Sequence, residues 1–275
     1  MHSRDLPKTL NRVDVEALIG AGKLAEAAAE LRAKGDLERA QSLYEKLWDF
    51  RTAAEIARER GDRPDALRLL LEAGALAEAA ELSDQLLGAD RGEQRRAAEL
   101  YERRRMWAEA AVLWEALGDL ERAHALYQKG LRPFEAARLD EQRGRLREAG
   151  LLYEQVLATS TGDSSGADAA HAHSRIGALF IRFGRYEEAA RHLQKTLAHP
   201  SVRGAARPLL VCALERLGYR TAAEQILTEV RADDLTPGFA CVDHARARLA
   251  GRIASAPGTT DRAVPVGTAT EGVRT

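Results

Sequence analysis

Residues that could carry chemistry are few and scattered in this sequence. His171 and His173 are two positions apart, so on a helix their side chains would point to nearly opposite sides and could not bind one metal ion. Cys212 and Cys241 each lack the nearby second cysteine of a zinc site, and they are interpreted as small apolar residues. Neighbouring carboxylates are frequent but typical of the solvated face of an amphipathic helix. We expect no metal site and no cofactor.

Several motifs of catalytic or nucleotide-binding proteins are missing. The sequence has no Walker-type phosphate loop, no His-Glu-x-x-His zinc motif, and neither the His-Arg-Asp nor the Asp-Phe-Gly triplet of kinases. These 275 residues are therefore expected to form a protein without enzymatic activity.

Composition excludes further classes of protein. The 41 Lys and Arg residues balance 42 Asp and Glu residues, so no overall field attracts nucleic acid or anionic lipid. No apolar run reaches the roughly 18 residues needed to cross a membrane, and the first residues lack the apolar core of a signal peptide. Two cysteines cannot form a disulfide framework, which favours a reducing compartment. We expect a cytoplasmic protein that does not bind membrane, and nucleic acid is a disfavoured partner.

The sequence contains an internal repeat of 13 residues, marked by a column of alanines. Larger apolar residues lie three positions before most of these alanines and three or four positions after each, on one face of a helix. Glycine, often followed by aspartate, lies five positions before and predicts a helix end and a new start. The alanines are Ala27, Ala40, Ala53, Ala66 and Ala79 and, after one interval of 18, Ala97, Ala110, Ala123, Ala136 and Ala149. This pattern predicts short helices that pair as antiparallel hairpins.

From Ala169 onward the period becomes 34 residues. Gly184 and Gly218 are one period apart, and Ala189 and Ala223 likewise. One period contains the segment from Ile176 to Phe180, then Gly184-Arg185-Tyr186-Glu187-Glu188-Ala189, then Leu193, Thr196 and Pro200. Together these features resemble a tetratricopeptide repeat. The resemblance is clearest over 169–231 and departs from the family at His173. The 13-residue block resembles a variant of that family with shorter helices.

The expected fold is all-α, an α-solenoid of antiparallel helical hairpins in two arrays joined by a flexible loop. The boundaries are an N-terminal capping helix over 1–21 with Asn11 as its cap, a short-helix solenoid over 22–158, and a linker over 159–168. Tetratricopeptide-like repeats with a capping helix follow over 169–254, and a disordered tail or tether over 255–275.

Two features of the short-helix array are candidates for binding a partner. The densest basic cluster has six arginines, with glutamates interleaved, and four of them are the candidate contacts. The six are Arg91, Arg95, Arg96, Arg103, Arg104 and Arg105, and the candidates are Arg95, Arg96, Arg103 and Arg104. Ion pairs on the helix surface, an acidic protein partner, and a nucleic-acid patch are the three interpretations of this cluster, of which the last is disfavoured. Trp48 replaces a turn glycine and either fastens a corner of the fold or stands exposed as a partner anchor.

The tetratricopeptide resemblance implies a role in holding a protein or peptide partner, as a scaffold or adaptor. Family members that bind a peptide carboxylate use Lys, Arg and Asn on first-helix positions, where this chain has Ser174, Ala178 and Cys212. That mode is unsupported, and a groove lined by small residues and arginine, with Ser174, Ala178 and Arg182, is expected instead.

An alternative is that the chain is the N-terminal regulatory arm of a larger bacterial signalling protein. Its 35 arginines against 6 lysines and its 52 alanines suggest a GC-rich bacterium, where helical repeats are often joined to serine/threonine kinase domains. A catalytic domain would then follow residue 275.

Overall fold

The computed structural model describes residues 14–160 and 166–230, and throughout these ranges the regular elements are α-helices without a strand. The all-α prediction is confirmed. The helices are α1 (Val15–Gly20), α2 (Leu24–Ala33), α3 (Leu37–Lys46), α4 (Phe50–Glu59), α5 (Arg63–Glu72), α6 (Leu76–Leu87), α7 (Arg91–Arg103), α8 (Trp107–Ala116), α9 (Leu120–Lys129), α10 (Pro133–Gln142), α11 (Leu146–Thr159), α12 (Gly166–Arg182), α13 (Tyr186–Thr196), α14 (Pro200–Arg216) and α15 (Arg220–Thr228).

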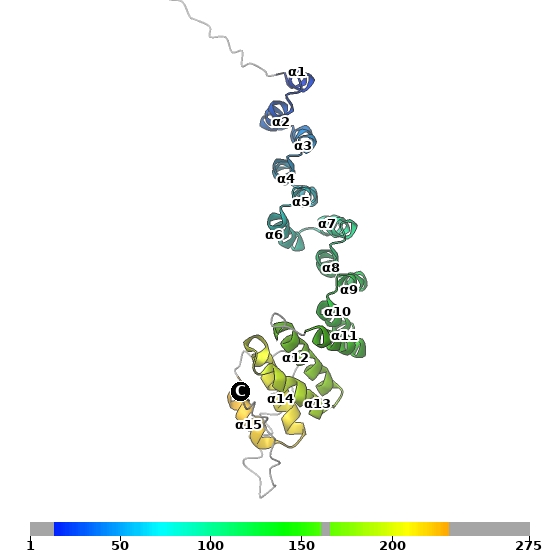
Figure 1. The fold of residues 1–275 in the computed structure, drawn as a ribbon, viewed down its shortest axis with the longest axis vertical. Helices are drawn as coiled ribbons and strands as arrows, with labels where there is room; N and C mark the ends of the chain where they lie inside the picture. The colour runs from blue at the N-terminus through cyan, green and yellow to red at the C-terminus, as the bar shows by residue number, and fades with distance from the viewer. Residues whose placement is uncertain (1–13, 161–165, 231–275) are drawn as a thin grey trace, which may run out of the picture. The chain divides into compact units, whose positions relative to one another are not determined.

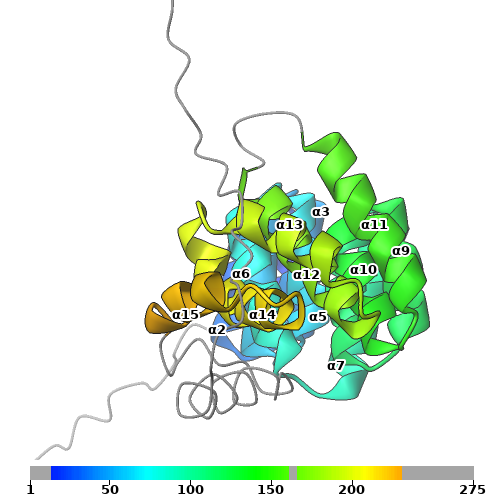
Figure 2. The ribbon, with the colours of Figure 1, turned by 90° about the horizontal axis from the view of Figure 1, so that it is seen from below.

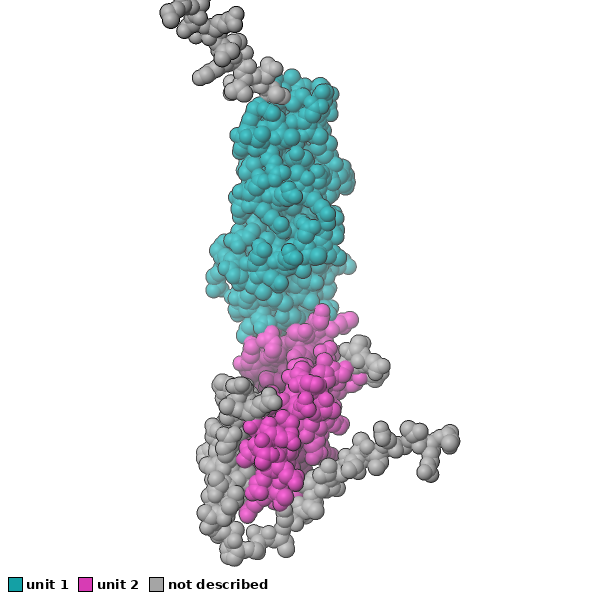
Figure 3. Space-filling view, turned by 90° about the vertical axis from the view of Figure 1, so that its left-hand side faces the viewer, with its two compact units in different colours: residues 1–130 teal, residues 131–275 magenta. Residues whose placement is uncertain are grey.

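The chain divides into two compact units, Met1–Gly130 and Leu131–Thr275 (Figure 3). Within the first unit, successive helices alternate between two layers, with odd-numbered helices in one and even-numbered helices in the other (Figure 1). The repeat alanines lie where neighbouring helices meet. Ala27, Ala40, Ala53, Ala66, Ala97, Ala110 and Ala123 have no exposed surface, which confirms the alanine column as the contact point between helices.

The turns of the first unit have the predicted chemistry. Gly35, for example, has a φ of 80°, a left-handed conformation that glycine adopts without steric cost. The aspartate that follows caps the next helix, as where the Asp119 carboxylate accepts a hydrogen bond from the Arg122 amide at 3.1 Å. At the first helix the prediction was wrong in detail, because Asp14 caps α1 by accepting from the Glu16 amide at 3.1 Å. Asn11 lies outside the described residues.

A hydrogen bond recurs between consecutive helices in the aromatic column of the repeat. Trp114 Nε1 donates to Glu102 Oε1 at 2.5 Å, and the Tyr127 hydroxyl donates to Glu115 Oε2 at 3.1 Å. Each donor lies 12 positions after its acceptor. The repeat therefore pairs its buried polar groups internally, which a close-packed interior requires.

Helices of the same layer are joined by ion pairs along the outer faces of the first unit. Each pair connects a helix to the next but one, and arginine provides the cation. The pairs are Arg39–Glu16 (α3 to α1), Arg32–Glu59 (α2 to α4), Arg68–Glu45 (α5 to α3), Arg51–Glu78 (α4 to α6), Arg63–Glu93 (α5 to α7) and Arg122–Glu102 (α9 to α7). The near-zero net charge thus reflects a surface in which the charges of opposite sign lie side by side.

The interval of 18 residues in the alanine column is accommodated at α6 and α7. Both helices are longer than the ten-residue helices around them, with 12 and 13 residues. Within the first unit these two helices share the smallest contact of any consecutive pair, and Figure 1 shows them set apart. The regular stacking of helices is interrupted at this point.

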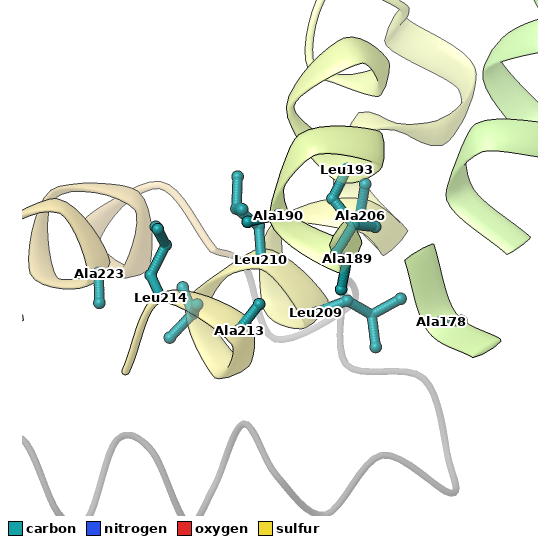
Figure 4. Close-up of a cluster of buried hydrophobic side chains, with 11 residues drawn as sticks. Ala178, Ala189, Ala190, Leu193, Ala206, Leu209, Leu210, Ala213, Leu214 and Ala223 are labelled. Atoms are coloured by element: carbon teal, nitrogen blue, oxygen red, sulfur yellow. The ribbon is translucent and has the colours of Figure 1, made fainter. Parts of the chain in front are cut away.

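The second unit combines helices of both repeat types in one packed structure. Tyr153 and Val156, from the 13-residue block, form a core cluster with Ala172, Ile176 and Leu179 of the 34-residue block. The helices α12, α13 and α14 then lie side by side (Figure 2), and α13, α14 and α15 bury a cluster that includes Leu193, Leu210 and Ala223 (Figure 4). The domain boundaries at 158 and 169 stay a prediction, and residues 161–165 and 231–275 lie outside the described residues.

We predict that Ala123→Leu destabilises the protein by about 1–3 kcal/mol, because the larger side chain forces apart helices that meet at a fully buried alanine. The matched control is Ala125→Leu in the same helix, where the alanine is exposed. Chemical denaturation followed by circular dichroism measures both. Equal stability of the two variants would contradict the role given to the alanine column.

Candidate functional site

Trp48 lies in the turn between α3 and α4 and is held in an unusual conformation. Its φ is 61°, the left-handed region that glycine occupies at most turns of this chain, and its side chain is 80% exposed. The ring contacts Phe50 edge to face with 5.7 Å between centroids. Leu47 beside it is also exposed. The structure therefore presents the indole to solvent, with Phe50 in edge-to-face contact on one side.

The arginine cluster on α7 is divided between ion pairs and exposed side chains. Arg96 Nη1 lies 3.3 Å from Asp62 Oδ1, and Arg104 pairs with Glu72 of α5. Arg95 and Arg103 are exposed and have no ion-pair partner within the described part of the chain. Among the described residues no contact joins these arginines to Trp48, and Arg96 and Arg104 stabilise packing between helices.

The groove residues predicted on α12 have a different environment from the one expected. Ser174 and Ala178 are buried, with 8% and 3% exposure, and Ala178 belongs to a core cluster with α13 and α14 (Figure 4). They cannot line an accessible groove, because the small side chains of this helix face allow other helices to pack against it. Arg182, one turn further on, is exposed as expected.

Arg182 lines a cavity of about 460 Å³ in the second unit. Its walls include a buried polar network, in which Glu141 accepts hydrogen bonds from Arg175 Nε at 2.8 Å and from the Tyr153 hydroxyl at 3.0 Å. Burial first, and the Glu141 carboxylate second, raise the pKa of Tyr153, so its hydroxyl stays protonated and continues to donate. The network satisfies its own charges and repeats the aromatic-to-glutamate bond of the first unit.

Two histidines of the second unit form a pair that the sequence analysis missed. His173 Nδ1 of α12 and His192 Nδ1 of α13 are 3.0 Å apart, and both side chains are half-buried. Burial first, then the charges of His192 and Lys195, lowers the pKa of His173 to about 4. The departure from the tetratricopeptide pattern at His173 was the signal that could have drawn attention to this pair.

An open cleft between α6 and α8 is the other feature that the sequence analysis missed. It has a volume of about 300 Å³ and is lined mainly by apolar side chains. Three of these, Leu76, Leu87 and Val112, are among the exposed large apolar residues of the protein. The signal in the sequence was the 18-residue interval between Ala79 and Ala97, which predicted an irregularity but not its shape.

The remaining chemistry-bearing residues do not form a reactive site among the residues that the structure describes. No group of three or more metal-ligating side chains occurs there, and no described helix is long and apolar enough to span a membrane. Cys212 is buried in α14 and disulfide-bonded, which the sequence analysis did not expect, and Cys241 lies outside the described residues. The stretch from Gly162 to Gly166 fits the Gly-x-Ser-x-Gly pattern, but helix α11 precedes it where a nucleophile elbow needs a strand.

Neither a protein-family model nor a curated protein matches this chain. Solved structures similar to it include BtubC from P. vanneervenii, at 18% identity and a TM-score of 0.40, covering 92% of this chain and 97% of that one. The TPR domain of P58(IPK) is similar at 19% identity and a TM-score of 0.40, covering 88% and 69%. The TPR2AB domain of yeast Sti1, solved as a complex with pHSP90, is similar at 16% identity and a TM-score of 0.26, covering 85% and 98%.

The histidine pair predicts a loss of stability in mild acid. Because the pKa of folded His173 lies below the unfolded value near 6.5, the neutral pair contributes fully above about pH 6.5. That contribution is lost as the pH falls from about 6.5 toward 4, since the unfolded chain binds the proton more readily.

His173→Gln should therefore reduce the difference in melting temperature between pH 7.5 and pH 5.0. The control is His199→Gln, where the ring contacts Ser201 instead, and this variant should keep most of the pH dependence. Thermal melts over that pH range measure both. A His173→Gln variant with the full pH dependence of the wild type would contradict the assignment.

Proposed function

We propose that this chain is a non-enzymatic scaffold that binds a protein partner, and that Trp48 is an anchor of the interface. The observation that supports the proposal is the conformation and exposure of Trp48, a large aromatic side chain 80% exposed at a turn position that glycine occupies in most repeats. Tryptophan is enriched among the residues that dominate binding energy at protein interfaces.

The left-handed conformation of Trp48 has an energetic cost. A left-handed φ costs a non-glycine residue about 1–2 kcal/mol. The edge-to-face contact with Phe50 returns about 0.5–1.5 kcal/mol, so the two effects nearly cancel. Trp48 therefore adds little to folding stability while leaving most of its apolar surface in water. A partner that covers this surface would gain the hydrophobic free energy that folding does not use.

The arginines of α7 support a protein partner over nucleic acid. Arg96 and Arg104 are neutralised by carboxylates of the same unit, and a phosphate backbone would have to displace those carboxylates. Arg95 and Arg103 remain exposed and are proposed as secondary contacts to an acidic surface of the partner. The cytoplasmic location and the bacterial source stay predictions.

The alternative, a regulatory arm of a longer bacterial signalling protein, also stays a prediction. No described residue favours it over an independent scaffold. Reading the coding frame beyond Thr275 would decide it, since a glycine-rich loop followed by the kinase triplets would support the alternative.

We predict that Trp48→Gly keeps the stability of the wild type within about 1 kcal/mol, because strain relief offsets the lost Phe50 contact. The same variant should lose the partner. Affinity capture with the tagged full-length chain, from lysate of the organism that encodes it, identifies proteins recovered by wild type but not by Trp48→Gly. The purified partner is then titrated into this protein, and the change in Trp48 fluorescence measures the affinity.

Leu131→Gly is the matched control, because Leu131 is also exposed in a left-handed turn, with 83% exposure and a φ of 54°. It should leave partner recovery unchanged. A large loss of stability in Trp48→Gly would show instead that Trp48 fastens a corner of the fold. Recovery of the same proteins by wild type and Trp48→Gly would contradict the proposed anchor.

A further inference from the structure

We propose that the cleft between α6 and α8 binds an amphipathic helix of a partner protein. The face of that helix that enters the cleft would be apolar, with Lys or Arg side chains along its edges. The inference rests on the proposed function, protein binding, and adds a second surface with a stated ligand chemistry. All twelve of its lining residues belong to the first unit.

The cleft exists because the repeat is interrupted there. Leu76 belongs to the column three positions before the repeat alanine, and the structure describes every leucine of that column. Leu24, Leu37, Leu120 and Leu146 are half-buried, whereas Leu76 is 63% exposed. The column has leucine at five of its ten positions, and only the leucine of α6 is exposed among these five. This exposure coincides with the small contact between α6 and α7.

The shape of the cleft suits a helix. One wall follows a stripe along α6, from Leu76 through Ala80 and Ser83 to Leu87, at the three- and four-residue spacing of a helix face. The other wall comes from the start and middle of α8, with Met106 and Val112. At about 1.5 Å per residue, α6 provides a wall roughly 18 Å long, enough for a partner helix of about three turns. Helices commonly recognise apolar grooves of this kind.

The charges around the cleft decide which helix fits. Asp84 and Glu109 line it and are exposed, and neither has an ion-pair partner within residues 14–160 and 166–230. None of the lining residues is Lys, Arg or His. Other glutamates of the first unit are neutralised by arginines of the next helix in the layer, as in Arg39–Glu16 and Arg68–Glu45. Two unpaired carboxylates beside an apolar surface favour a ligand that brings its own cations.

The floor of the cleft supports the same conclusion. Tyr101 is 2% exposed, and its hydroxyl is hydrogen-bonded to Ser83, so the floor has no unsatisfied polar group to hold a small polar ligand. Asp84 and Glu109 line the same cleft as Tyr101. Burial first, and these two carboxylates among the lesser causes, raise the pKa of the Tyr101 hydroxyl, so it stays protonated. The polar recognition in this cleft therefore lies at the rim, where a flanking Lys or Arg would lie.

The test uses a fluorescein-labelled helical model peptide with leucines on one face and lysines beside them, measured by fluorescence anisotropy with the full chain. The control peptide has glutamate in place of lysine. We expect binding of the lysine peptide and not of the glutamate peptide. Asp84→Asn with Glu109→Gln should weaken binding by about 2- to 20-fold at low salt, and by less in 0.5 M salt.

Leu76→Ser should weaken binding, and Leu151→Ser is its matched control, because Leu151 is 67% exposed but lies in the second unit. Thermal melts verify that both variants fold. A photo-crosslinking residue at Ala80, which lines the cleft, should label the peptide, and the same residue at exposed Ala125 of α9 should not.

Equal binding of the two peptides, or equal effects of Leu76→Ser and Leu151→Ser, would overturn the proposal. Crosslinking of Ala80 only to a second copy of this chain would assign the cleft to self-association and would also overturn it. The proposed function is tested separately, because its readout is the partner lost with Trp48→Gly. If Leu76→Ser keeps that partner and the lysine peptide fails to bind, the cleft proposal fails alone.

Discussion

The close approach of short helices at a buried alanine is the constraint on which the first unit depends. A ten-residue helix is marginal in water, so each one is held by its neighbours. Alanine allows the backbones to approach, and larger residues on either side, such as Leu43 and Tyr127, then fill the remaining space. This packing fixes the distance between helices and therefore the short turn, which in turn requires a left-handed residue such as Gly61.

The polar pattern follows from the same constraint. Because the helices repeat at a fixed distance, two repeat positions that are in contact once are in contact again in the next repeat. One hydrogen bond can therefore recur along the array. Tyr127 to Glu115 and Tyr153 to Glu141 are two such bonds, one in each unit. The ion pairs between next-but-one helices also recur, but they lie on the exposed surface. Each surface pair contributes little alone, but together they leave few charges of this face available to a charged ligand.

The periodic part of the structure could be predicted from the sequence, and the aperiodic part could not. Alanines such as Ala123 and glycines such as Gly118 recur at fixed spacing, so their roles in helix packing and in turns follow from helix geometry and turn chemistry. Ser174 and Ala178 show the limit, because small residues at helical spacing fit both a groove and a packed contact between helices, and only the positions of α13 and α14 decide. His173 and His192 are 19 residues apart, and their contact depends on tertiary packing that no local pattern encodes.

Both proposed binding surfaces lie where the structure departs from its repeat. In a regular array each apolar residue has a neighbour that covers it and most carboxylates have an arginine beside them, so little free energy remains for a partner. Trp48 occupies a left-handed turn position where most repeats have glycine, and at the junction of α6 and α7 the helices are longer than in the regular repeat. At both places an apolar side chain stays in water, and at the junction Asp84 and Glu109 also lack a cation. Because folding does not use these groups, we expect their substitution to have little effect on stability, and we propose that they contribute to binding.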